Sequence, residues 1–107
     1  IAFSTPANPT GWTASREELE ALLAFGRDRG VWIVSDEVYN RLSFEGEAAP
    51  SILQIAEPED LVLSVNSFSK AWAMTGWRCG WLTHPASAAP ALGAMTQYMN
   101  SGTAGPI

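Results

Sequence analysis

Seven side chains that could do chemistry follow three short apolar segments of the sequence. They supply an amide, a carboxylate, a phenol, two hydroxyls, an amine and a guanidinium: Asn8, Asp36, Tyr39, Ser67, Ser69, Lys70 and Arg78. The apolar segments 1–4, 31–34 and 61–65 are typical of strands buried in a parallel sheet. Because ligands of such sheets bind at the carboxyl ends of the strands, we expect these side chains to meet around one ligand. That ligand would offer an anionic group, a cationic ring nitrogen and an electrophilic carbon.

Lys70 is the centre of this predicted site. Its neighbours in 68–74 are largely apolar, and a desolvated lysine amine beside a cationic group loses its proton readily and can form a Schiff base. The same pattern fits an ordinary surface lysine at the start of a helix, with its ammonium in water.

Ser67, Ser69 and Arg78 are suited to binding a phosphate. The serines flank Lys70 where a strand gives way to a helix, and hydroxyls and free backbone N–H groups at such a place favour an anion. A guanidinium can add a bidentate contact to the same phosphate. As alternatives, the serines could cap the helix and Arg78 could form a structural salt bridge.

Asp36 directly follows a buried strand, where a carboxylate needs a cationic partner. A protonated ring nitrogen would be such a partner. Tyr39 lies on the same side if the segment turns helically. The alternatives are a capping role for Asp36 and a place at the edge of the core for Tyr39, with its hydroxyl satisfied.

The elements that would position these residues alternate between strand and helix. A capping box of Ser15 and Glu18 predicts a helix that runs to about Arg29 and ends at Gly30. Strands are predicted at 1–4, 31–34, 61–65 and 76–83, a short helix at 51–56 and a longer one at 86–99, followed by a loop over 100–106. This order indicates an α/β domain with a mostly parallel sheet.

Composition excludes several classes of protein. The 107 residues carry a formal net charge of −5, which makes the chain a poor general nucleic-acid binder. No apolar run approaches the ~20 residues of a membrane span. With Cys79 as its one cysteine, the chain has no internal disulfide.

Four motifs, in this order, resemble the signatures of the class I/II aminotransferases, which are fold-type I enzymes dependent on pyridoxal 5′-phosphate: Asn8-Pro9-Thr10-Gly11, Asp36-Glu37-Val38-Tyr39, Ser67-Phe68-Ser69-Lys70 and Gly76-Trp77-Arg78-Cys79-Gly80-Trp81. The spacings agree with the family as well, with 28 residues from Asn8 to Asp36 and eight from Lys70 to Arg78. The resemblance covers essentially the whole chain.

The resemblance implies a role for each residue of the predicted site. Lys70 would form the Schiff base with the cofactor and carry the proton between the substrate Cα and the cofactor C4′. Asp36 would keep the pyridine nitrogen protonated, so that the ring acts as an electron sink. Asn8 and Tyr39 would donate to the cofactor's 3′ oxygen. The phosphate would be held by Ser67, Ser69 and Arg78, and the Asn8–Pro9 bond would be cis.

By the same resemblance, residues 1–107 form the central segment of a large, three-layer α/β/α domain that is incomplete at both ends. The sequence starts at Ile1 without an initiator Met. We expect the glycine-rich phosphate loop and the ring-stacking residue upstream, and the arginine for the substrate carboxylate downstream in a small domain. The complete protein would be a cytoplasmic homodimer acting on an amino acid and a 2-oxo acid, with Ser101 or Thr103 near the partner's phosphate.

Two other functions would use similar residues. A carbon–sulfur β-lyase has the same scaffold and the same cofactor contacts. Some transcriptional regulators carry an aminotransferase-like domain as a sensor behind a DNA-binding module. We adopt the transaminase hypothesis for the complete protein. We expect the isolated fragment to be inactive.

Overall fold

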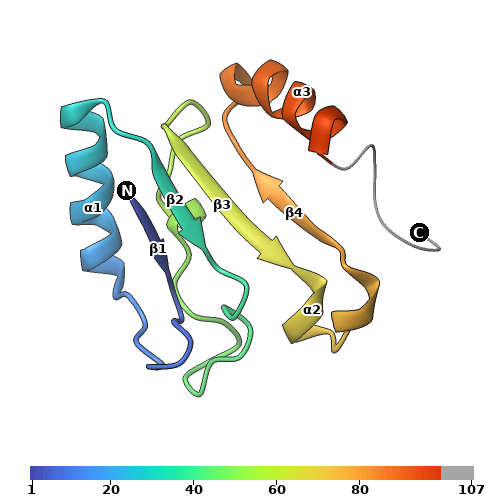
Figure 1. Cartoon of the computed structure of the whole chain (residues 1–107). Helices are drawn as coiled ribbons and strands as arrows, with labels where there is room; N and C mark the ends of the chain where they lie inside the picture. The colour runs from blue at the N-terminus through green and yellow to red at the C-terminus, as the bar shows by residue number, and fades with distance from the viewer. Residues whose placement is uncertain (100–107) are drawn as a thin grey trace.

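The computed structural model describes residues 1–99. Its strands form one sheet in the order β1-β2-β3-β4, with helix α1 beside the parallel half and α3 following β4 (Figure 1). The strands are β1 (Ala2–Ser4), β2 (Ile33–Asp36), β3 (Val62–Ser67) and β4 (Gly80–Thr83). The helices are α1 (Arg16–Arg29), α2 (Phe68–Ala71) and α3 (Ala89–Met99), with 3-10 turns η1 (Ile52–Gln54), η2 (Thr75–Trp77) and η3 (Ala86–Ala88).

Helix α1 begins and ends where the sequence predicts. The Ser15 hydroxyl accepts a hydrogen bond from the Glu18 backbone N–H at 3.1 Å, and the Ser15 N–H donates to the Glu18 carboxylate at 2.8 Å. Gly30 ends the helix in the left-handed conformation, with φ of 60°, which costs glycine little. Both local signals are therefore confirmed.

The sheet is parallel except at β4. β1 pairs with β2 and β2 with β3 in parallel, whereas β4 runs antiparallel to β3. The predicted strand over 76–83 is wrong in its first half. Residues 75–77 instead form turn η2, and the strand starts only at Gly80, after Arg78 has taken a left-handed backbone with φ of 52°.

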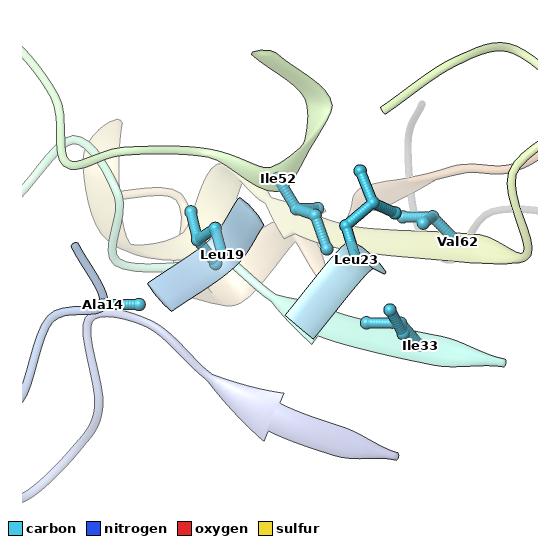
Figure 2. Close-up of a cluster of buried hydrophobic side chains, with 6 residues drawn as sticks. All are labelled: Ala14, Leu19, Leu23, Ile33, Ile52 and Val62. Carbon is cyan, nitrogen blue, oxygen red and sulfur yellow. The ribbon is translucent and has the colours of Figure 1, made fainter. Parts of the chain in front are cut away.

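Helix α1 and turn η1 cover one face of the sheet, where the hydrophobic core lies. Its buried members come from the helix and the residue just before its N-cap, the turn and two strands (Figure 2): Ala14, Leu19, Leu23, Ile33, Ile52 and Val62. Burying a side chain such as leucine or isoleucine contributes about 1.5–3 kcal/mol. Side chains on the other face of β2 and β3, among them Val34, Leu63 and Val65, are only half-buried.

An ion pair ties the end of α1 to the start of β3. The Arg27 guanidinium donates twice to the Asp60 carboxylate, at 2.8 and 2.7 Å, and the Glu57 N–H donates to it as well. The pKa of Asp60 is lowered, and the hydrogen bonds from Arg27 are the largest cause. This contact lies at the end of the sheet opposite to the predicted site.

No helix within residues 1–99 is long and apolar enough to cross a membrane.

Candidate functional site

The carboxyl ends of β1, β2 and β3 lie side by side and are joined by backbone hydrogen bonds. The Thr5 N–H donates to the Asp36 carbonyl at 2.9 Å, and the Glu37 N–H donates to the Val65 carbonyl at 2.9 Å. Parallel pairing of these strands therefore brings three loop starts to one edge of the sheet (Figure 1). The predicted site residues follow from these three ends.

Asn8, Tyr39 and Lys70 meet at this edge although they come from two different loops and from helix α2. The Asn8 side-chain amide donates to the Tyr39 hydroxyl at 3.4 Å. The Lys70 Nζ lies 5.7 Å from the centroid of the Tyr39 ring. Asn8 and Lys70 are exposed and Tyr39 is half-buried, so an amine, an amide and a phenol face the same open space.

Asp36 is the last residue of β2, and its side chain lies on the sheet face opposite α1, because neighbouring Ser35 and Glu37 are buried on the other side. One carboxylate oxygen accepts from the Val38 N–H at 3.2 Å. Within residues 1–99 the carboxylate forms no ion pair. A half-buried carboxylate without a cation is suited to a cationic ligand.

Ser67 and Ser69 stand where β3 passes directly into α2. The Ser67 hydroxyl caps the helix, accepting from the Ser69 N–H at 3.1 Å and donating to the Cys79 carbonyl at 3.2 Å. The capping alternative is thus realised for Ser67. Ser69 is 8% exposed, and its hydroxyl forms no hydrogen bond inside the described part of the chain.

Arg78 follows η2 and is exposed. Its guanidinium donates to the Thr75 carbonyl at 2.9 Å, which fixes the side chain locally. No carboxylate among residues 1–99 pairs with it, so the structural salt bridge considered above is not formed there. Two residues later, Gly80 pairs with Ser67 across the β3–β4 ladder, so the backbone brings Arg78 close to the strand end that bears the serines.

Phe68, Trp72 and Trp81 form an aromatic cluster in which two members flank Lys70 in the chain. The Phe68 ring lies 5.4 Å from Trp72 and 4.9 Å from Trp81, centroid to centroid, and the Arg41 guanidinium lies 5.6 Å from the Trp72 ring. The two tryptophans remain 45% and 39% exposed. The Lys70 amine itself lies over the Tyr39 ring, and the aromatic cluster comes from residues on either side of Lys70 in the chain and from β4.

Sequence reasoning passed over Glu37, which is the only fully buried carboxylate among the described residues. The signal was present, because side chains alternate along a strand: if Asp36 points to the site, its neighbour must point into the core. The sequence also gave no sign that Thr5–Pro6 is cis. The Asn8–Pro9 bond is cis, as the resemblance implies. Ser101 and Thr103 lie outside the described residues.

Known proteins with similar sequences place this arrangement in a family. The sequence profile described as aminotransferase class I and II matches residues 1–107. The LL-diaminopimelate aminotransferase of Desulforudis audaxviator is 37% identical over 97 residues, which are 91% of this chain and 25% of that protein. The aspartate aminotransferase of Thermotoga maritima is 38% identical over 101 residues, 94% of this chain and 26% of that protein.

Solved structures agree in fold. The crystal structure of the aspartate aminotransferase of Thermotoga maritima superposes with a TM-score of 0.88 at 37% identity, covering 95% of this chain and 27% of that one. The α/β fold predicted from the sequence is therefore that of fold-type I. The chain spans about a quarter of the length of these relatives. On its sequence and its fold, it belongs to the class I and II aminotransferase family.

Proposed function

We propose that residues 1–107 are the central segment of the large domain of a pyridoxal-phosphate-dependent aminotransferase. The complete protein would transfer an amino group between an L-amino acid and a 2-oxo acid. The observation that carries the proposal is the meeting of Asn8, Tyr39 and Lys70 beside Asp36 at one edge of the sheet. Membership of the family supports the reaction class.

The donor set fits the cofactor group by group. A phosphate needs N–H and O–H donors and positive charge, which Ser69 and Arg78 offer without a competing carboxylate in residues 1–99. A protonated pyridine nitrogen needs a carboxylate, and that of Asp36 has no cation there. The 3′ oxygen needs donors, and Asn8 and Tyr39 are within hydrogen-bond reach of each other.

When bound, the cofactor would supply an electron sink for the negative charge that develops at the substrate Cα. Asp36 would hold the proton on the ring nitrogen, and Asn8 and Tyr39 would orient the ring through its 3′ oxygen. Lys70 would bind the cofactor covalently through Nζ. Released by the incoming amino acid, the same amine would move a proton between the substrate Cα and the cofactor C4′.

The assembly of the complete protein is part of the proposal. A homodimer is supported by the family resemblance and by the exposed aromatic side chains near the site, since Trp72, Trp77 and Trp81 are 45%, 45% and 39% exposed. A cytoplasmic location is supported by the resemblance alone.

Lys70 provides the direct test, since it is the single lysine of the chain. In a full-length protein that contains this chain, borohydride reduction of the cofactor-loaded form should place the label on Lys70, as read by peptide mass spectrometry. Lys70→Ala should abolish the absorbance band of the covalently bound cofactor while the phosphate contacts retain part of the binding.

Arg41→Ala is the matched control, because it removes a neighbouring exposed cation that lies over Trp72 and is not assigned to the cofactor. It should keep the band. A label on a lysine outside this chain, or an unchanged band in Lys70→Ala, would remove Lys70 from its proposed role.

A further inference from the structure

Glu37 is a carboxylate with no exposed surface and a full set of hydrogen bonds. Its Oε1 accepts from the Ser35 hydroxyl at 2.9 Å and from the Ile52 N–H at 3.0 Å. Its Oε2 accepts from the Ser51 hydroxyl at 2.5 Å. A polar group buried this completely needs such donors in place of water, and the three contacts form an ordered network inside the fold.

The network lies directly beneath the candidate site. Glu37 stands between Asp36 and Tyr39 in the chain, and the backbone around it is fixed by its own hydrogen bonds. The Glu37 N–H donates to Val65 at 2.9 Å, and the Glu37 carbonyl accepts from the Asn40 N–H at 2.9 Å. The side chain of Asp36 faces the site, whereas that of Glu37 points into the interior.

The far end of the network is anchored in the hydrophobic core. Ile52 is fully buried and packs with Leu19 and Leu23 of α1 (Figure 2). Its N–H is the one that Glu37 accepts. The carboxylate therefore connects the end of β2, which bears the site residues, to a turn that the core holds in place.

We propose that Glu37 is a positioning residue of the active site: by bonding Ser35, Ser51 and Ile52 it fixes the backbone from which Asp36 and Tyr39 reach the cofactor. The inference rests on the proposed function. Glu37 itself touches neither cofactor nor substrate. Its loss leaves three donors without their acceptor, so the segment 36–39 loses its fixed orientation.

The test compares two alanine variants in a full-length protein that contains this chain. Glu37→Ala and Asp60→Ala each remove a carboxylate that accepts three hydrogen bonds, but Asp60 lies at the opposite end of the sheet. The readouts are the rate of cofactor release and the pH midpoint of the bound cofactor's absorbance band. Under the proposed function Tyr39 would stabilise the deprotonated 3′ oxygen, so a loosened Tyr39 should raise that midpoint.

Glu37→Ala should release the cofactor about tenfold faster, because the loss of hydrogen bonds that support binding residues weakens binding by about that factor. It should also raise the pH midpoint of the absorbance band. Asp60→Ala should leave both readouts at the wild-type values. Glu37→Gln, which retains an oxygen acceptor for Ile52 and Ser35, should restore most of the binding. Equal effects of the two alanine variants, or wild-type readouts in Glu37→Ala, would overturn the proposal.

Two further results keep the proposal separable from folding and from the proposed function. If Glu37→Ala yields no folded protein, Ser51→Ala replaces it, since that change removes one hydrogen bond of the same network. A shift in both the release rate and the pH midpoint of Ser51→Ala then supports the proposal. Wild-type values of both in Ser51→Ala overturn it. A wild-type protein that binds no cofactor contradicts the proposed function, and therefore also the premise of the proposal about Glu37.

Discussion

At the scale of the residue, neighbouring side chains of one strand serve opposite purposes. Asp36 faces the site and Glu37 the core, because alternation along a strand sends successive side chains to opposite faces. The sequence predicts the first role from the polar group at a strand end. It does not reveal the second, because the partners Ser51 and Ile52 lie 14 and 15 residues away and only the folded chain brings them near.

Tyr39 gives the prediction at this scale. Tyr39→Phe removes the hydroxyl that meets Asn8 at 3.4 Å. A neutral hydrogen bond contributes about 0.5–1.5 kcal/mol, so kcat/KM of the full-length enzyme should fall by up to roughly tenfold. The pH midpoint of the cofactor band should rise, since the proposed function makes this hydroxyl a donor to the 3′ oxygen.

Tyr98→Phe is the control, because Tyr98 lies on α3 and is 92% exposed. Steady-state kinetics and an absorbance titration should find it identical to the wild type. If Tyr39→Phe also behaves as the wild type in both measurements, the phenol has no part in the chemistry.

At the scale of the element, local signals predicted the fold better than strand patterns did. The capping box at Ser15 and the glycine at position 30 gave the limits of α1 because capping depends on adjacent residues alone. The strand predicted over 76–83 fails in its first half. Its alternating aromatic residues fit a strand, but the backbone turns at 75–77 and Arg78 before β4 begins.

Substitution of Gly80 tests whether the close approach of strand β4 to strand β3 is needed for stability. A Cβ at this position would lie 2.5 Å from the Asn66 carbonyl oxygen, so Gly80→Ala must push the strands apart at the end where Cys79 accepts from Ser67 and Phe68. We expect a loss of about 1–3 kcal/mol in stability, together with weaker cofactor binding.

Gly76→Ala is matched to this change, since a Cβ there meets no atom within 4 Å. Thermal unfolding and cofactor titration of both full-length variants provide the comparison. The close approach would be unimportant if Gly80→Ala unfolded at the same temperature as Gly76→Ala and bound the cofactor equally well.

At the scale of the whole molecule, the proposed function assigns residues of this chain to the cofactor and none of them to the substrate carboxylate. Four of its five arginines have other contacts: Arg16 with Glu20, Arg27 with Asp60, Arg29 with Asp28 and Arg41 with the Trp72 ring. The fifth, Arg78, donates to the Thr75 carbonyl and is proposed to bind the phosphate. The relatives are about four times longer, so the remaining parts of a site have room elsewhere.

The isolated 107-residue chain should therefore not transaminate. Incubated with cofactor, an amino donor and a 2-oxo acid, it should give no product above a blank without protein, as measured by chromatography of the amino acids. A full-length protein that contains the chain is the positive control in the same assay. Turnover by the isolated chain would mean that these residues already hold the substrate.

The left-handed backbone of Arg78 has a consequence for how the site could evolve. A residue with a Cβ at φ of 52° sits in a conformation that costs about 1 kcal/mol and that glycine adopts freely. Local energetics alone would thus select glycine between η2 and β4. An arginine at this position lowers the stability of the fold, and under the proposed function the positive charge that it would offer a phosphate compensates for that loss.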